Sequence, residues 1–160
     1  MKPVILVVTM SCVGLFAGGA CAQSSASPAQ QAIRSQMAKM LVAANAHDTD
    51  GFMASMVRTP NLVFAINGEV IRGWQALHAQ QLKWWHHGRS AAKYAQRGTP
   101  MFTALEPDIE ILTWPLRSSH VRPDGKVGTS AFVVTYVWQH LPQGWRIVYG
   151  HESWAKPPGR

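Results

Sequence analysis

Residues 135–154, TYVWQHLPQGWRIVYGHESW, have the pattern of a β-hairpin. Both arms are rich in β-branched and aromatic residues, which favour strands, and Pro142 and Gly144 mark the turn between them. The second arm carries two polar residues, His151 and Ser153, in an otherwise apolar strand. Because successive side chains alternate across a strand, we predict that these two point to the same side of the sheet.

The predicted register of this hairpin directs a set of side chains into one cavity. A two-residue turn between Leu141 and Gly144 gives these pairs: Trp138 with Ile147, Tyr136 with Tyr149, Val134 with His151, and Phe132 with Ser153. A turn at residues 124–125 brings Arg117 opposite Phe132 on the same face. Because small-molecule sites usually combine an aromatic wall with a few polar groups, we predict a ligand site of these residues: Arg117, Phe132, Tyr136, Trp138, Tyr149 and Ser153. A slip of one residue would reverse every one of these assignments.

His151 is the candidate catalytic residue. It could act as a general base or as a hydrogen-bond donor, because imidazole ordinarily titrates near neutral pH, or it could be a buried structural histidine. Arg117 could hold an anionic group with two hydrogen bonds, or it could be a surface arginine. Glu152 faces away from His151 by strand alternation, so we expect it at a rim or an interface and not as an acid catalyst.

The N-terminus has the layout of a secretory signal peptide. Lys2 precedes an apolar run over residues 4–20, and small residues allow cleavage after Ala22. A membrane-spanning helix is the alternative, but the run is short for one. Cleavage before Cys21 with lipidation of that thiol is a second alternative. We expect a periplasmic or secreted protein that does not associate stably with a membrane unless Cys21 is lipidated.

The composition of residues 23–160 excludes several classes of site. Cys12 and Cys21 both lie in the predicted leader, so the mature chain has no disulfide, cysteine nucleophile or thiolate metal site. The formal net charge of the whole chain is +7, but its Lys and Arg residues are scattered, and we expect no nucleic-acid partner. We also expect no cofactor and no metal. His86 and His87 are adjacent on a predicted helix and diverge too far to share an ion.

The rest of the pattern places helices before strands. Helical spacing predicts a helix from Pro28 to about Ala46, a second one through Val57 and a third over residues 74–87. The strand-like segments are residues 62–66, 70–71, 94–105, 109–121, 126–140 and 145–154. This order predicts an α+β fold with three N-terminal helices packed on a curved antiparallel sheet. The domain spans residues 30–154, between a linker at 23–29 and a flexible tail at 155–160.

Both faces of the strand around residues 131–138 are apolar. One face carries Phe132, Val134, Tyr136 and Trp138, and the other carries Ala131, Val133, Thr135 and Val137. Helices can cover only one face of this sheet, whereas a free face would be polar. We therefore expect a second copy of the chain to cover the other face, in a homodimer.

The order of elements and three stretches of sequence resemble the nuclear transport factor 2-like superfamily. The stretches are NAHDTDGF at residues 45–52, GWQAL at residues 73–77, and the closing hairpin. More narrowly, the chain is similar to SnoaL-like proteins and to the association domain of calcium/calmodulin-dependent protein kinase II. The similarity to that domain is greatest at these residues: Thr129, Ser130, Thr135, Val137, Trp138, Gly144, Trp145, Val148, His151 and Ser153. The resemblance implies a cone-shaped half-barrel whose helices and curved sheet enclose a pocket, usually in a dimer.

The resemblance implies a fold more strongly than a reaction, because the superfamily includes isomerases, dehydratases, hydrolases, cyclases and oligomerisation domains. Chemistry like that of ketosteroid isomerase needs a carboxylate on the first strand pair and a donor on the first helix. Residues 63–66 contain no carboxylate, and Met40 stands at the donor position. An epoxide-hydrolase-like network cannot be built from Asp108, Arg117 and Asp124, since two of them lie at turns.

These departures leave three hypotheses for the function. The first is an exported domain that binds a small, partly apolar organic molecule, neutral or anionic, without assigned turnover. The second is an acid/base enzyme of the isomerase, dehydratase or cyclase type that uses His151. The third is an oligomerisation module. A second titratable group within reach of His151 would favour the enzyme over the binding protein.

Overall fold

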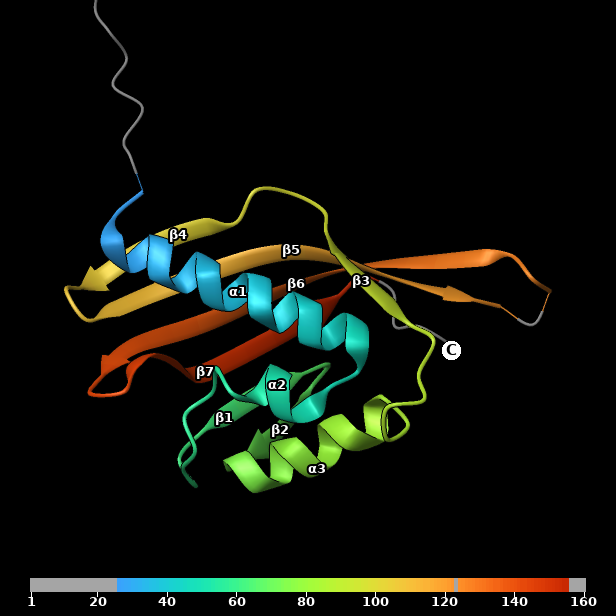
Figure 1. Ribbon diagram of the computed structural model, residues 1–160, viewed down its shortest axis with the longest axis horizontal. Helices are drawn as coiled ribbons and strands as arrows, with labels where there is room; N and C mark the ends of the chain where they lie inside the picture. The colour runs from blue at the N-terminus through green and yellow to red at the C-terminus, as the bar shows by residue number, and fades with distance from the viewer. Residues whose placement is uncertain (1–25, 123, 156–160) are drawn as a thin grey trace, which may run out of the picture.

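The computed structural model describes residues 26–122 and 124–155, and within them three helices pack against one face of a curved sheet (Figure 1). The elements in chain order are α1 (Pro28–Ala46), α2 (Thr49–Met53), β1 (Val63–Ile66), β2 (Glu69–Arg72), α3 (Trp74–Trp84), β3 (Lys93–Gln96), β4 (Met101–Glu106), β5 (Ile109–Val121), β6 (Val127–Leu141) and β7 (Gly144–Trp154). The predicted leader, residues 1–22, lies outside the described residues, as do residues 156–160 of the predicted tail. None of the described helices is long and apolar enough to cross a membrane.

The sheet places its first strand in the chain, β1, beside its last, β7. Its strand order is β2–β1–β7–β6–β5–β3, and β4 pairs with the other half of the β5 edge. The predicted α+β class, with helices before a curved sheet, is confirmed. The sheet is mixed and not purely antiparallel, because β1 runs parallel to β7. A parallel pair needs a long connection, and residues 67–143, with α3 and four strands among them besides β2, lie between these two strands.

Helix α1 begins and ends where the sequence predicts. The Ser27 hydroxyl accepts a hydrogen bond from the Gln30 backbone N–H at 3.2 Å, and Pro28 occupies the first turn, where its missing N–H costs nothing. The helix ends at His47, which takes a left-handed conformation with φ 54°. The buried residues of α1 recur at helical spacing and face the sheet: Ile33, Met37, Met40, Ala43 and Ala44. This apolar stripe fixes α1 across β5 and β6 (Figure 1).

Helices α2 and α3 are both shorter than predicted. After Met53 a turn leads into a segment that pairs with β7: the Val57 N–H donates to the Ile147 carbonyl at 2.9 Å, and residue 56 bridges to β7. Helix α3 stops at Trp84, and His86 and His87 have positive φ values of 49° and 55°. The sequence pattern did not show the end of α2, since pairing with a distant strand outweighs local helix propensity.

The predicted strand over residues 94–105 is two strands. β3 pairs with Leu116–Ser119 of β5, and β4 pairs with its first half. Between them Pro100 has no N–H for a ladder, and Gly98 lies against the Pro115 side chain. The strand is therefore interrupted here, and β3 and β4 pair with two different stretches of the same edge of β5.

The core lies between the helices and the concave face of the sheet. Side chains of β6 alternate as predicted: Phe132, Val134, Tyr136 and Trp138 are buried, and the residues between them are half-buried on the convex face. Trp138 is the largest side chain with no exposed surface. The concave face of this strand is thus the centre of the apolar core.

The register of the closing hairpin agrees with the prediction only near its turn. Trp138 pairs with Ile147 as expected, but Val137 pairs with Tyr149, so Val148 is an extra residue in a β-bulge. Beyond the bulge, each residue of β6 pairs with the β7 residue one position later than predicted. Glu152, and not His151, is therefore the partner of Val134.

The register between β5 and β6 also differs from the prediction by one residue. Arg117 pairs with Ala131 and lies on the convex face, whereas Leu116 is the partner of Phe132. The connection between these strands is longer than the predicted two-residue turn. Residues 121 and 127 are the last pair before it.

Candidate functional site

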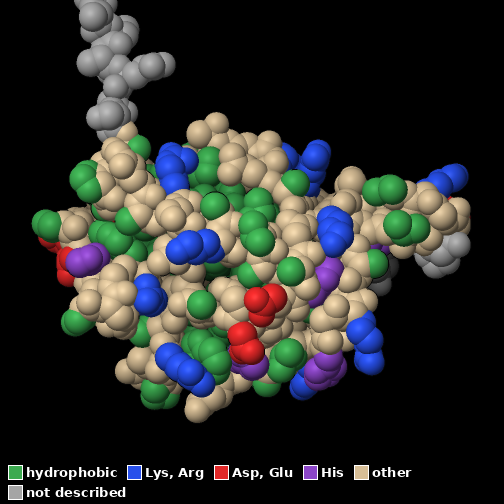
Figure 2. Space-filling model, viewed as in Figure 1, with side chains coloured by type: hydrophobic (Ala, Val, Ile, Leu, Met, Phe, Trp, Pro, Cys, Tyr) green, Lys and Arg blue, Asp and Glu red, His purple; other side chains and the backbone are tan. Residues whose placement is uncertain are grey.

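A cavity of about 500 Å³ lies between the helices and the concave face of the sheet. Every layer of the fold contributes to its wall: Met40, Leu41 and Ala44 from α1, Phe52 from α2, Gln81 and Trp84 from α3, and strand residues from β1, β3, β5, β6 and β7. The cavity is large enough for a small organic molecule, and its wall is mainly apolar. Figure 2 shows that Lys and Arg side chains on the viewed face are dispersed and do not gather around one opening.

Aromatic rings form much of this wall and hold one another in place. Phe132 stacks on Trp154 with ring centroids 4.3 Å apart, and Phe52 and Trp85 make a T-shaped contact with centroids 5.2 Å apart. The Trp85 Nε1–H donates a hydrogen bond to the Tyr94 hydroxyl at 3.0 Å. Rings that are packed and hydrogen-bonded in this way give the cavity a fixed shape before any ligand enters.

Glu152 is the one carboxylate among the described residues that line the cavity. It stands on β7, and its Oε1 accepts a hydrogen bond from the Trp154 Nε1–H at 2.6 Å. Burial raises the pKa of Glu152 from 4.5 to about 7, although the hydrogen bond from Trp154 lowers it in part. A carboxyl group with such a pKa exchanges a proton at neutral pH.

Two tyrosines share the cavity wall with Glu152. Burial raises the pKa of the Tyr136 hydroxyl, and the charge of Glu152 raises it further. Burial and, to a smaller extent, Glu152 also raise the pKa of Tyr94. Both hydroxyls therefore stay protonated at neutral pH and can serve as hydrogen-bond donors.

Gly150 makes room for the Tyr136 ring beside Glu152. A Cβ atom at Gly150 would lie 2.6 Å from Cδ2 of Phe64 and 3.1 Å from Cε1 of Tyr136. Only a glycine lets both rings pack over β7 at this point. The glycine therefore positions Tyr136 in the wall.

The structure brings two of the predicted ligand residues to the cavity and leaves the others elsewhere. Phe132 and Tyr136 line it. Trp138 shares their face of the sheet but lies in the closed core, outside the lining. The exposed convex face carries the other three ligand residues, Arg117, Tyr149 and Ser153, and also the candidate catalytic residue His151. The predicted orientation of His151 toward the cavity is wrong, because the bulge at Val148 turns it outward.

The sequence analysis missed Glu152 for the same reason. Alternation correctly placed Glu152 and His151 on opposite faces, but the register assigned those faces the wrong way round. A sequence signal for the site was present, since a single carboxylate between Gly150 and Trp154 interrupts an aromatic strand. Without the bulge, that signal could not be assigned to the cavity.

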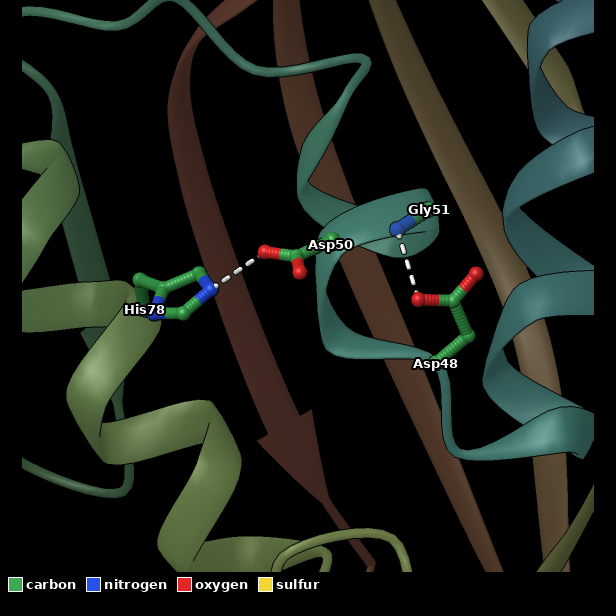
Figure 3. A network of polar contacts seen from close by, with 4 residues as sticks. All are labelled: Asp48, Asp50, Gly51 and His78. Carbon is green, nitrogen blue, oxygen red and sulfur yellow. Dashed lines mark hydrogen bonds and ion pairs between the residues drawn. The ribbon is translucent and has the colours of Figure 1, made fainter.

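Helices α2 and α3 are joined by a hydrogen bond between their side chains. The His78 Nε2 lies 2.8 Å from an Asp50 carboxylate oxygen, and Asp48 accepts a hydrogen bond from the Gly51 backbone N–H (Figure 3). The Asp50 side chain is 89% exposed, so this pair contributes at most about 1 kcal/mol to stability. No group of three or more His, Cys, Asp or Glu side chains in the described part of the chain is arranged to hold a metal ion.

Comparisons with known proteins support the fold. No family model matches the chain, and no curated protein sequence matches it significantly. A nuclear transport factor 2-like protein of unknown function from Shewanella oneidensis is 18% identical with a TM-score of 0.66, and the match covers 77% of this chain and 97% of that one. A ketosteroid isomerase-like protein from Erwinia carotovora is 15% identical with a TM-score of 0.62, covering 79% and 96%. A candidate calcium/calmodulin-dependent protein kinase II association domain from Xanthomonas campestris is 15% identical with a TM-score of 0.63, covering 84% and 95%.

These identities are too low to transfer a reaction or a ligand. They establish the fold, which is that of the nuclear transport factor 2-like proteins, as the sequence predicted. The function has to be argued from the cavity itself.

Proposed function

We propose that this protein binds a small, partly apolar organic molecule in the cavity between its helices and the concave face of its sheet. The observation that carries the proposal is the cavity of about 500 Å³, with a packed aromatic wall and one carboxylate. A preformed apolar hollow with few polar groups is the usual form of a small-molecule site. Because residues 1–22 have the pattern of a secretory signal peptide, we propose that this binding protein is exported.

Binding can be tested with N-phenyl-1-naphthylamine, an uncharged probe that fluoresces in apolar surroundings. We expect saturable binding to the wild-type protein and at least a tenfold rise in Kd for Ala92→Phe, because Ala92 lines the cavity and a ring there would fill part of it. The matched control is Ala91→Phe, since Ala91 is exposed and outside the lining. Fluorescence titration gives Kd, and circular dichroism verifies folding.

A second blocking variant, Ser90→Phe, keeps the test decisive if Ala92→Phe does not fold. Ser90 also lines the cavity. Unchanged probe affinity in both folded blocking variants would show that the probe binds elsewhere. Absence of saturable binding to the wild-type protein would contradict the proposal.

An acid/base enzyme is the second candidate, and Glu152 is the observation that favours it. A carboxyl group with a pKa of about 7 that shares the cavity wall with Tyr136 is a suitable proton donor and acceptor at neutral pH. This moves the candidate base from His151, on the convex face, to Glu152 in the cavity. Recovery of a copurified molecule unchanged after incubation would favour binding without turnover.

We also propose that the convex face of the sheet is covered by a second copy of the chain. Its side chains are largely apolar, and exposed ones include Tyr149 at 37%, Met101 at 56% and Val70 at 62%. The described convex-face residues of β5, β6 and β7 include no carboxylate. A broad apolar face without acidic groups is typical of a surface that is buried in a two-fold dimer.

Tyr149→Glu should convert this dimer into a monomer. The substitution places an unpaired carboxylate in each half of a two-fold interface, and burial of such a charge opposes association. Size-exclusion chromatography with light scattering measures the mass. Val42→Glu is the matched control, because Val42 is 72% exposed on α1, on the helical side of the molecule. A monomeric wild-type protein would exclude the proposed dimer, and a dimer without a ligand would favour the oligomerisation module.

A further inference from the structure

We propose that the ligand of this cavity carries a positive charge, as a protonated or quaternary amine, and that the Glu152 carboxylate is its counter-ion. This inference rests on the proposed binding function and names the chemical class of the ligand. It replaces the sequence-based expectation of a possible anion.

The charges around the cavity favour a cation. Of the described residues that line it, Glu152 is the only carboxylate, and none is Lys or Arg. Arg117, which the sequence analysis assigned to an anionic group, lies exposed on the convex face. Apart from the tyrosines and tryptophans, the other polar lining residues are Asn67, Gln81, Ser90, Ser118 and His120. An anion would therefore face the Glu152 carboxylate without a compensating cation.

One carboxylate oxygen of Glu152 is available to accept a hydrogen bond from a ligand. Its Oε1 is engaged by the Trp154 indole, but among the described residues no hydrogen bond engages Oε2. A charge-assisted hydrogen bond from an ammonium group to this oxygen would be stronger than one between neutral groups. A quaternary amine, which has no N–H, would be held by the charge alone.

The aromatic wall suits the same kind of ligand. Rings from three elements meet around Glu152: Tyr94 from β3, Phe132 and Tyr136 from β6, and Trp154 from β7. The faces of such rings attract cations, and aromatic cages with one carboxylate recognise methylated ammonium groups. The same rings would bind a neutral apolar molecule, so they do not decide the charge by themselves. The Glu152 carboxylate is the group that favours a positively charged ligand.

The ionisation of Glu152 predicts the pH dependence of binding. Because its pKa is about 7, the carboxyl group is largely neutral at pH 5 and largely charged at pH 8.5, so affinity for a cation should rise over this interval. The tyrosines that face it, Tyr94 and Tyr136, stay neutral throughout. His120 lines the cavity from β5, and Arg122 lies beside it over Gly128. Because His120 and Arg122 also lie near this wall, the pH profile must be repeated in a Glu152 variant.

Three probes of nearly the same shape test the charge. They are benzyltrimethylammonium, its uncharged carbon analogue neopentylbenzene, and the anion phenylmethanesulfonate, each measured by displacement of N-phenyl-1-naphthylamine. At pH 8.5 we expect the cation to bind at least tenfold more tightly than the carbon analogue, and the anion to bind most weakly. At pH 5 the preference should fall to less than threefold.

Glu152→Gln should remove the preference for the cation at pH 8.5. The matched control is Glu69→Gln, because Glu69 is exposed on β2, outside the lining, and should leave the preference intact. Equal affinities for the cation and its carbon analogue, or a preference that survives in Glu152→Gln, would overturn the inference. If N-phenyl-1-naphthylamine binds but the cation does not displace it, the inference fails while the proposed binding function stands. If no probe binds at all, both fail.

Discussion

Replacing Trp138 by Ala should lower the free energy of unfolding by about 4 kcal/mol. Trp138 has no exposed surface, and it is the largest fully buried side chain of the protein's described part. Its ring meets Tyr136 edge-on with centroids 6.4 Å apart. Removal of the indole would leave a void in the centre of the core, where the neighbouring strands cannot collapse to fill it. Urea denaturation followed by circular dichroism measures the change.

Trp138→Phe is the informative companion to this substitution. Among the described residues no group accepts a hydrogen bond from the buried Trp138 Nε1–H, so phenylalanine removes an unsatisfied donor while it keeps most of the apolar volume. We expect less than half of the loss seen for alanine. Trp74→Ala is the surface control, since Trp74 is only partly buried beneath Arg58. A loss below about 1.5 kcal/mol for Trp138→Ala would contradict the position of the core.

The sequence was sufficient to place Trp138 on the helix-facing side of β6, because this strand is long and regular, but it wrongly assigned the residue to the cavity lining. β6 spans Val127–Leu141, and its alternation separates the two faces without reference to any partner strand. Helix α1 was predictable for a similar reason, since Ser27 and Pro28 mark its start locally. The fold resemblance rested on the order of the elements and on three stretches of sequence: residues 45–52, residues 73–77 and the closing hairpin.

The site depended on features that are not local. The bulge at Val148 carries no glycine or proline that would mark it, yet it reverses the faces of every later residue in β7. The early end of α2 also depends on a distant strand, because residues 55–57 pair with Ile147. Pairing between distant segments therefore decided that Glu152, and not His151, lines the cavity. Sequence alternation alone shows that Glu152 and His151 lie on opposite faces of β7, but not which of them faces the cavity.

Glu152→Gln should stabilise the fold at pH 9 by about 2 kcal/mol and change its stability little at pH 4. Burial raises the pKa of Glu152 from 4.5 to about 7, so at intermediate pH the folded state holds a proton that the unfolded state has released. The stability of the wild-type protein therefore falls as pH rises from about 4.5 to above 7, and the loss is complete once both states are ionised. A shift of this size corresponds to about 3 kcal/mol, and access of water through the cavity reduces it.

The difference between the two pH values separates charge from shape. Glutamine keeps the volume of Glu152 and an oxygen that can accept the Trp154 Nε1–H, so an effect of packing would be equal at pH 4 and pH 9. Urea denaturation at both values, with Glu69→Gln as the exposed control, gives the two numbers. If Glu152→Gln raises the free energy of unfolding only at high pH, the buried Glu152 carboxylate destabilises the free protein because it has no counter-ion. This is expected of a group whose counter-ion is a bound cation. Equal stability of the two proteins at pH 9 would mean that water already satisfies the carboxylate, and Glu152 would then gain little from a bound cation.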